Sequence, residues 1–451
     1  MPEVLHVKTE QIDTIEKRRA YTVSVIGCGQ EGLIYGVAFA EAGFKVLCTD
    51  ADQSLVKRLA RGRTGFSDRE IESKFKTLVR TGSLIATSDL KNAVLQSDII
   101  ILTIAAKIDD KKNSDYSEVE NSTKQVGSAM KRGALAIYGV VAGFGFMENV
   151  VKEALENASG LKVGDDFGLA YSPLQASAEQ PTFKSLGNRE LKVAANDKTS
   201  LAAASTILAT ITKTGLRQAA DFKTAELAAL FSAVRRDVGV ALANELAVLC
   251  ENADIDYFEA LKLLDSELPL TRLVPTIAEN RKIEAYLLME TAENLNARLR
   301  MTALARQVNE DMVRHAVNLT QDALRSCGRT LRRARIAVLG ATGQGTTGET
   351  FVKMLVAKGA KTSLYDPLLP KNENIDRTET PRRNLNEALE GADCLVLLSE
   401  LEHVKRVNFK NLQAIMRSPA AIVDLTGTIE PQKAKKEGFI YRGLGRGTGK
   451  K

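Results

Sequence analysis

Residues 23–40 read VSVIGCGQEGLIYGVAFA, in which a glycine-rich turn joins two apolar runs. The turn has the GxGxxG spacing at Gly27, Gly29 and Gly32. After a strand, the first glycine permits a tight turn, the second lets the backbone approach a pyrophosphate, and the third lets helix and strand pack closely. The N–H groups of the helix start, near Gln30, would face the phosphate charge. The stretch predicts a Rossmann-type dinucleotide-binding unit.

An acidic residue follows the next predicted strand, residues 45–49, at Asp50. Its carboxylate can accept hydrogen bonds from the adenosine ribose hydroxyls and would repel a 2′-phosphate, so we expect NAD rather than NADP. Glu31 lies in the turn beside the expected pyrophosphate, and its charge is tolerable there only if it points to solvent. The expected cofactor-binding residues are Gly27, Cys28, Gly29, Gln30, Glu31, Gly32 and Asp50.

The same strand and helix rhythm returns late in the chain. Apolar runs predict strands at residues 23–26, 45–49, 99–104, 134–140, 335–339, 361–365, 394–398 and 421–424. Between the two groups, from Thr224 to Cys327, apolar residues recur every three or four positions, which is typical of long helices. The expected fold class is α/β, with two doubly wound Rossmann-like domains joined by a long-helix central domain. The expected boundaries are 1–215, 216–328 and 329–451.

The composition excludes several classes of protein. A chain of 451 residues, 44% hydrophobic and 26% charged, is typical of a globular protein with two or three domains. No apolar run approaches the roughly 20 residues that span a bilayer, and residues 1–8 lack the apolar region of a secretory signal, so a cytoplasmic location is expected. Five scattered cysteines without a CxxC pair and three histidines predict neither a metal site nor a disulfide framework.

The net charge is +6, and the excess of basic residues is partly concentrated in residues 329–335 and 442–451. These runs could contact nucleic acid or an anionic sugar nucleotide, or form a solvated helix end and a frayed terminus. No aromatic residues are interleaved with the basic ones in the manner of a nucleic-acid surface. We therefore expect solvated basic residues, with neither a nucleic acid nor a membrane as partner.

Further motifs follow in order along the chain, among them Asp115-Tyr-Ser117, Ala170-Tyr-Ser-Pro173, Thr224-Ala-Glu-Leu227, Ala243-Asn-Glu-Leu-Ala247, Tyr365-Asp-Pro367 and Gly443-Leu-Gly-Arg446. Together with the glycine turn, this collinear series resembles the UDP-glucose/GDP-mannose dehydrogenase family, nearest to its archaeal nucleotide-sugar dehydrogenases. The resemblance implies an NAD-dependent oxidoreductase of polysaccharide biosynthesis with a nucleotide-sugar-binding C-terminal domain. It also implies a homodimer formed through the central helices. The apolar period from Leu227 to Leu246 predicts a buried helical spine, which in the family forms the dimer interface. The alternative is that this face packs only within its own chain.

The family oxidises a sugar alcohol to an acid by two hydride transfers to NAD, through a cysteine thiohemiacetal and thioester. The stretch that corresponds to its cysteine loop, residues 275–288, reads PTIAENRKIEAYLL and has no cysteine. The family's lysine and asparagine fall on Ala229 and Ala233, and its acidic residue after Ser-Pro falls on Leu174. Other family positions are also substituted, at Tyr138-Gly139, at residues 105–107 and within Gly340 to Glu349. The catalytic residues are therefore unknown from the sequence.

Two main interpretations remain open. The first is a nucleotide-sugar 6-dehydrogenase, or a variant that stops after a two-electron step, for which Lys282 and Glu284 of the substituted loop are candidate groups. The second is a catalytically inactive NAD-binding homologue that acts as a regulatory or partner subunit. A hydroxyacid or 6-phosphogluconate dehydrogenase is disfavoured by the second α/β domain. Cys250 is expected to be a buried packing residue, and Cys327, which precedes Gly328, to mark a helix end.

Overall fold

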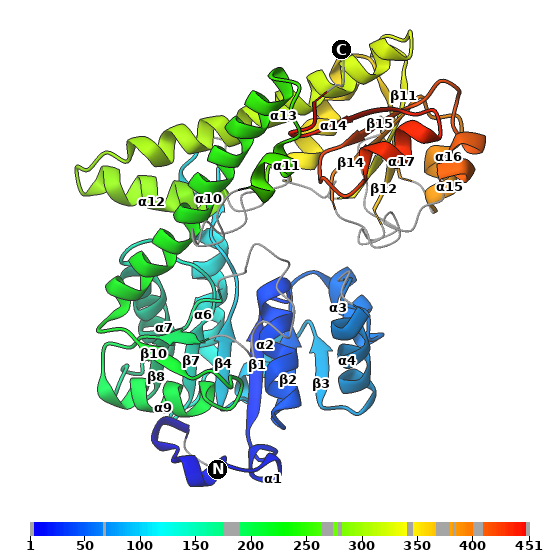
Figure 1. The fold of residues 1–451 in the computed structure, drawn as a ribbon. Coiled ribbons are helices and arrows are strands. Elements are labelled where there is room, and N and C mark those ends of the chain that lie inside the picture. Colours follow the sequence, from blue (N-terminus) through cyan, green and yellow to red (C-terminus); the bar gives the residue numbers. More distant parts are fainter. Residues whose placement is uncertain are drawn as a thin grey trace. The chain divides into compact units, whose positions relative to one another are not determined.

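The computed structural model describes residues 4–65, 69–109, 111–174, 190–263, 274–277, 282–340, 346–366, 379–381, 384–399 and 409–447. The chain forms two compact units, Met1–Val234 with Ile283–Arg298, and Arg235–Lys282 with Leu299–Lys451. Each unit contains a six-stranded parallel sheet (Figure 1). The expected boundaries of three domains, at residues 215/216 and 328/329, stay a prediction.

The sheet of the first unit has the order β3-β2-β1-β4-β7-β8. Its strands are β1 Thr22–Ile26, β2 Lys45–Thr49, β3 Leu84–Thr87, β4 Ile99–Leu102, β7 Leu135–Tyr138 and β8 Gly168–Tyr171. The strand order reverses between β1 and β4, where Ile26 is paired with Thr49 on one side and with Leu102 on the other. In such sheets ligands bind outside the carboxyl ends of the strands at this reversal. The glycine turn follows β1 and therefore lies at that place.

Helices connect these strands, and several begin at an aspartate. The side chains of Asp52, Asp89 and Asp197 accept hydrogen bonds from backbone N–H groups in the first turns of their helices, as good N-terminal caps do. The helical segments are α1 Ile15–Arg18, α2 Gln30–Glu41, α3 Gln53–Ala60, α4 Arg69–Arg80, α5 Leu90–Leu95, α6 Ser117–Ala129, the π-helix η3 Met147–Lys152, α7 Glu153–Ser159 and α9 Lys198–Leu208. Two short strand pairs, β5 Lys107–Ile108 with β6 Ser114–Asp115 and β9 Leu191–Val193 with β10 Leu216–Gln218, complete the unit.

The sheet of the second unit repeats the same reversal, with the order β13-β12-β11-β14-β15-β16. Its strands are β11 Arg335–Leu339, β12 Lys361–Tyr365, β13 Glu379–Pro381, β14 Cys394–Leu397, β15 Ala421–Asp424 and β16 Ile440–Gly443. The helices around it are α14 Thr347–Ala357, α15 Leu385–Leu389, α16 Phe409–Ile415 and α17 Pro431–Lys436. The predicted two Rossmann-like sheets are confirmed.

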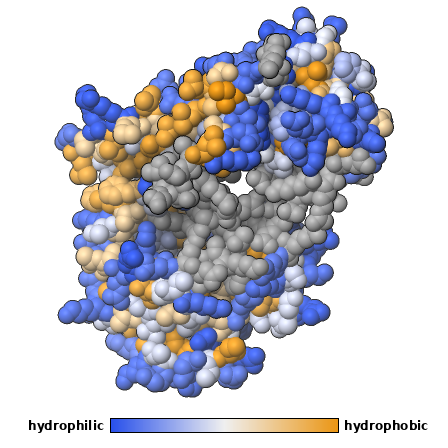
Figure 2. Space-filling view, viewed as in Figure 1, coloured by the Kyte–Doolittle hydropathy of each residue, from blue (hydrophilic) through white to orange (hydrophobic). Residues whose placement is uncertain are grey.

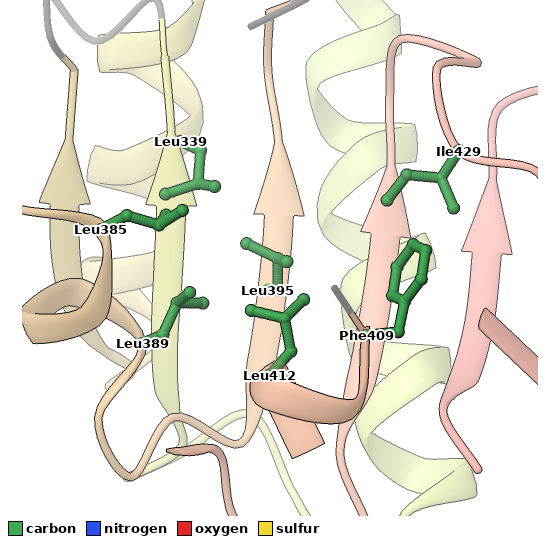
Figure 3. A pocket seen from close by; sticks show the side chains of 7 residues that line it. All are labelled: Leu339, Leu385, Leu389, Leu395, Phe409, Leu412 and Ile429. Atoms are coloured by element: carbon green, nitrogen blue, oxygen red, sulfur yellow. The ribbon is translucent and has the colours of Figure 1, made fainter. Parts of the chain in front are cut away.

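A small apolar cavity lies between the second sheet and the helices α15 and α16 (Figure 3). It is lined by Leu339, Leu385, Leu389, Leu395, Phe409, Leu412 and Ile429. Its volume is about 10 Å³, which is the room of about one water molecule. The cavity is a packing gap, too small for a nucleotide or a sugar.

Long helices α10 Phe222–Asn252 and α13 Arg300–Ser326 confirm the predicted helical centre, with α11 Tyr257–Lys262 and α12 Lys282–Asn294 between them. In the second unit α10 and α13 are joined by buried polar side chains. Arg306 donates from Nε to the Asp237 carboxylate at 2.7 Å, and Asn309 donates to the same carboxylate at 3.0 Å. Asn244 in turn donates to Asn309 at 3.0 Å. A buried ion pair is tolerated only with such additional hydrogen bonds, so this set specifies how the two helices pack.

Two local expectations about these central segments can be compared with the structure. Cys327 is the C-cap of α13 and Gly328 has a φ of 72°, so the predicted helix end is confirmed. The prediction of a loop at residues 275–288 is wrong in part, because Lys282 begins a helix and Glu284 lies within that helix. Its apolar residues Ala285, Tyr286 and Leu287 are buried, which explains the helix. Residues 278–281 and the Lys282 side chain lie outside the described residues.

The expectation of solvated basic residues is wrong for three arginines. Arg329 pairs with Asp393 at 2.7 Å, Arg442 pairs with Asp322 at 2.7 Å, and Arg446 pairs with Asp256. The side chain of Arg442 is buried. Each of these carboxylates is distant in sequence from its arginine, so the charge pattern along the chain did not predict the ion pairs.

Across the described residues, no helix is both long and apolar enough to cross a membrane. A search of the same part of the chain finds no group of three or more His, Cys, Asp or Glu side chains placed to hold a metal ion.

Candidate functional site

The glycine turn has the close packing that its spacing predicted. Gly27 has a φ of 93°, in the left-handed region, and its N–H donates to the Thr49 carbonyl of β2 at 2.8 Å. A side chain on Gly32 would collide with the Gly27 carbonyl oxygen and with Thr103. Gly29 is different, because a Cβ there would meet no atom within 4 Å. The turn therefore needs Gly27 and Gly32 for its own packing, whereas Gly29 leaves open room beside the backbone where a pyrophosphate fits.

Helix α2 presents its amino end to this room. Gly29 is its N-cap, and the first intrahelical hydrogen bond runs from Leu33 N to the Gly29 carbonyl at 3.0 Å. The N–H groups of Gln30, Glu31 and Gly32 precede that bond and are directed out of the helix start. Gln30 and Glu31 are half-buried. This arrangement suits an anion such as a pyrophosphate.

Asp50 links the end of β2 to the glycine turn. One carboxylate oxygen accepts a hydrogen bond from Cys28 N at 2.7 Å, and the other accepts one from Asp52 N at 2.9 Å. A carboxylate has about four lone-pair sites, so both oxygens retain capacity for ribose hydroxyls. The Cys28 thiol is buried, and its contact with Cys48, together with burial, raises its pKa well above the usual value. Cys28 is therefore a packing residue rather than a nucleophile.

The loop after β4 is attached to the same turn by Thr103, a contact that the sequence analysis did not predict. The Thr103 hydroxyl donates to the Gly27 carbonyl at 2.6 Å, and Gly139 comes close to both Thr103 and the Tyr35 ring. The Tyr35 hydroxyl donates to the Ser172 carbonyl after β8. The loops that follow β1, β4, β7 and β8 thus hold one another in place at the carboxyl edge of the sheet.

Aromatic rings fill the carboxyl ends of β7 and β8. The Tyr138 hydroxyl donates to the Ile104 carbonyl at 2.8 Å, and the Tyr171 hydroxyl accepts a hydrogen bond from Ala142 N at 3.2 Å. The rings of Tyr138 and Phe146 are 5.3 Å apart between centroids. Burial raises the pKa of both tyrosines, so these phenols stay neutral. Tyr138 and Gly139 stand where the resemblance places a Ser-Thr pair, so two small hydroxyls are replaced by one buried phenol and a glycine.

Glu226 is a buried carboxylate that was predicted only as part of the Thr224–Leu227 motif, without a structural role. It lies in the first turns of α10, and its two oxygens accept hydrogen bonds from Gly145 N at 2.6 Å and from Met147 N at 2.8 Å. Desolvation raises its pKa to about 7, against the lowering effect of these two bonds. An acidic residue inside the apolar run from Ala225 to Leu230 was the signal that could have revealed it. Glu226 holds the loop after β7 against α10.

The positions of the family's acid–base chemistry are apolar here. Ala229 and Ala233 are buried, and Leu174 packs against the core of the first unit. The described cysteines are all free thiols. Cys250 is half-buried against the small cluster of Ala243, Ala247 and Tyr257, so its predicted packing role is confirmed in part. The described residues therefore combine a cofactor cradle with an apolar helix face where the resemblance would place a lysine and an asparagine.

The second sheet has its own tight turn after β11. Gly340 has a φ of 83°, and a side chain there would collide with Ser399 at the end of β14. Residues 341–345, which fall within the predicted substitutions from Gly340 to Glu349, lie outside the described residues. The structure therefore describes the start of this turn and leaves its predicted nucleotide-sugar contacts untested.

Three sequence models of one family match the chain in succession. The NAD binding domain of the UDP-glucose/GDP-mannose dehydrogenase family matches residues 21–212, the central domain matches 223–311, and the UDP binding domain matches 345–431. The chain belongs to the UDP-glucose/GDP-mannose dehydrogenase family. Its cofactor is NAD, and it has the UDP binding domain of the family. The predicted family, cofactor and class of sugar-nucleotide domain are confirmed.

Individual relatives are similar over almost the whole chain. UDP-N-acetyl-D-mannosamine dehydrogenase of Pyrococcus horikoshii is 28% identical over 438 residues, which cover 94% of this chain and 99% of that protein. The enzyme of the same name from Methanococcus maripaludis is 23% identical over 452 residues, 96% of this chain and all of that protein. The solved P. horikoshii structure matches with a TM-score of 0.77 at 26% identity, covering 95% and 100% of the two chains. A UDP-glucose dehydrogenase from Pyrobaculum islandicum shares the fold, with a TM-score of 0.76 at 21% identity over 94% and 98%.

The open room at Gly29 leads to a prediction for the cofactor site. Gly29→Asn places a side chain where a Cβ meets no protein atom, and asparagine is a favourable N-cap, so the free protein should keep its melting temperature. NAD at about 100 times its Kd should stabilise the wild type by about 2.7 kcal/mol in a thermal-shift experiment. The variant should lose most of this shift. Gly82→Asn, which also meets no atom within 4 Å but has a φ of 73° that asparagine tolerates better than most residues, is the control, and its NAD-induced shift should equal that of the wild type. An unchanged shift for Gly29→Asn would contradict a pyrophosphate at this turn.

The raised pKa of Glu226 predicts how stability depends on pH. Its pKa is about 7 in the folded protein against an ordinary 4.5, so between these values the folded state binds a proton that the unfolded chain has released. The free energy of unfolding should therefore fall as pH rises through this window, by on the order of 3 kcal/mol. Urea denaturation of Glu226→Gln across the same range should show a flatter profile. Glu153→Gln, an exposed position on α7 of the same unit, should keep the wild-type slope. Equal slopes for all three proteins would refute this role of Glu226.

Proposed function

We propose that this chain is an NAD-dependent dehydrogenase that oxidises a CH–OH group of a UDP-linked sugar without a cysteine thiolate. The observation that carries the proposal is the meeting of Gly29, the amino end of α2 and Asp50 at the order reversal of the first sheet. The pyrophosphate of NAD lies over Gly29, within the turn from Gly27 to Gly32, and the Asp50 carboxylate accepts hydrogen bonds from the ribose hydroxyls. The charge of Glu31 is tolerable in this arrangement only if its side chain points away from the phosphates.

The number of oxidation steps that we expect follows from the missing cysteine. Oxidation of a sugar alcohol to an aldehyde transfers one hydride to one NAD. The family's second oxidation passes through a cysteine adduct, but residues 275–288 hold no cysteine and Ala229 and Ala233 are buried alanines. We therefore expect the reaction to stop at the aldehyde, with one NADH formed for each sugar consumed.

The first substrate to test comes from the relatives. The proteins of P. horikoshii and M. maripaludis described above are UDP-N-acetyl-D-mannosamine dehydrogenases, and both are similar to this chain from end to end. UDP-N-acetylmannosamine is accordingly our leading candidate, followed by UDP-glucose. A cytoplasmic location stays the prediction made from the sequence.

The proposed function can be tested with the purified full-length chain. Incubation with NAD and a panel of UDP- and GDP-sugars should give NADH absorbance with at least one UDP-sugar, and end-point titration should give one NADH per sugar. Two NADH per sugar would contradict the two-electron limit. Gly29→Asn should give no NADH at moderate NAD concentration. If no sugar supports turnover by the wild type, the dehydrogenase proposal fails and the alternative of an inactive partner subunit gains support.

We also propose that the chain forms a homodimer through its central helices. On α10, Leu230 and Val234 are buried within the chain whereas Phe231, Leu242 and Leu246 are exposed, so its own chain covers the predicted apolar face only in part. In the second unit Leu242, Leu246 and Leu249 follow one side of α10 with exposed fractions of 44%, 37% and 61%. Figure 2 shows apolar side chains gathered over the central helices. A contiguous apolar surface of this kind marks an interface, and a second copy is the partner that the resemblance favours.

The dimer can be tested by light scattering coupled to size-exclusion chromatography. The wild type should have a mass near twice the 49.0 kDa of one chain. Leu242→Glu combined with Leu249→Glu should give a monomer, because two carboxylates would have to be buried in the interface. Leu95→Glu, at an exposed apolar position that ends α5, is the matched control and should leave the mass unchanged. A monomeric wild type would contradict the proposal.

A further inference from the structure

A chain of polar groups lies beside the carboxyl edge of the first sheet. The Ser114 hydroxyl donates to the Glu290 carboxylate of α12, and the Ser114 side chain also hydrogen-bonds to the Tyr116 hydroxyl. All three residues belong to the first unit and are half-buried, so they are shielded but not sealed from solvent. A phenol, an alcohol and a carboxylate are thus arranged in one hydrogen-bonded series.

Tyr116 is held in place by its packing. Its ring contacts Phe146 at 4.7 Å between centroids, and Phe146 in turn packs on Tyr138 at the end of β7. Gly143 lies against the Tyr116 hydroxyl, and a side chain at that glycine would collide with it. The hydroxyl therefore has a defined position, next to a backbone segment that follows β7.

The topology places Tyr116 on the nicotinamide side of the proposed cofactor. Asp50, which we assign to the adenosine ribose, follows β2, and the pyrophosphate lies at the turn after β1. Across the order reversal come β4 and β7, and Tyr116 ends the loop that follows β4. A dinucleotide that lies across this edge carries its nicotinamide toward β4 and β7.

Tyr116 also lies beside the loop that is attached to the helix with the family's substituted lysine position. Glu226 of α10 accepts hydrogen bonds from Gly145 N and Met147 N, and Tyr116 lies against Gly143 and Phe146 of the same loop. Ala229 is one helical turn beyond Glu226 on α10. The phenol hydroxyl is thus close to the place where a proton acceptor is needed and where the helix provides only a methyl group.

We propose that Tyr116 is the catalytic residue that takes the proton of the substrate alcohol, and that Ser114 and Glu290 pass a proton onward. This rests on the proposed dehydrogenase function. The alcohol proton goes to the Tyr116 oxygen while the tyrosine proton goes to the Ser114 oxygen and the serine proton goes to the Glu290 carboxylate. The C–H hydrogen leaves with its electron pair for the nicotinamide of NAD, which is reduced as the alcohol becomes a carbonyl. Glu290 is left protonated, and it then releases this proton to solvent.

The relay explains how a neutral tyrosine can act here. Burial raises the pKa of Tyr116 to about 12, and the Ser114 contact only partly offsets the rise. A phenolate is therefore scarce at neutral pH, and Tyr116 accepts a proton only as it gives up its own. A carboxylate at the far end of the series supplies the acceptor.

The test measures turnover of the UDP-sugar that the wild type oxidises, together with the thermal shift that NAD produces. Tyr116→Phe keeps the ring and removes the hydroxyl, and kcat should fall by roughly 10²- to 10⁴-fold. Glu290→Gln and Ser114→Ala should lower kcat in the same direction. In all three variants the NAD shift and the KM for the sugar should stay close to the wild-type values, which a loss of packing would not preserve.

Matched controls make the same chemical changes elsewhere. Tyr21→Phe alters a tyrosine at the opposite edge of the sheet, and Glu293→Gln alters an exposed glutamate one turn along α12. Both should turn over as the wild type does. If the wild type forms NADH but Tyr116→Phe or Glu290→Gln retains at least a third of its kcat, the relay is refuted and the dehydrogenase stands. If the wild type forms no NADH with any sugar, both proposals are refuted.

Discussion

The approach of α2 to the end of β1 is the constraint on which the rest of the first unit depends. Gly32 can sit against the Gly27 carbonyl only because it has no side chain, and this contact brings the amino end of the helix onto the carboxyl edge of the sheet. Thr103 and Asp50 then hydrogen-bond to the same turn from the two neighbouring strands. The cradle is therefore preorganised by the protein alone, and a ligand has only to enter it.

Local patterns allowed much of this architecture to be predicted. Strands β2, β11 and β15 have the predicted bounds, because a buried parallel strand is a largely apolar run bordered by turn residues. The more polar strand β12 also has the predicted bounds. The glycine turn, Asp50 and the helix end at Cys327 were predictable for the same reason. In each case the residues that determine the structure are adjacent in sequence.

The rest depends on contacts between distant residues, which a single sequence does not reveal. Glu226 looks like an ordinary helix glutamate until the loop of Gly145 folds onto it, and Arg442 looks solvated until Asp322 of α13 reaches it. Leu246 fits an apolar helix face, but the period does not tell whether that face is covered by its own chain. Helix α12 was missed because the resemblance suggested a loop, whereas its buried residues favour a helix.

The apolar substitutions at the chemistry positions have a consistent physical logic. A buried lysine or asparagine without a partner costs free energy, and evolution retains such a residue when a reaction uses it. Once Ala229 and Ala233 occupy the inner face of α10, that face packs as an ordinary core, and Tyr138 and Phe146 complete an apolar wall at the end of β7. Among the polar groups beside this wall, Glu226 is occupied by two backbone hydrogen bonds, whereas Tyr116, Ser114 and Glu290 form a series. The Tyr116 hydroxyl lies against Gly143 in the segment that follows β7, and the series behind it ends in a carboxylate, which is why we assign the substrate proton to this route.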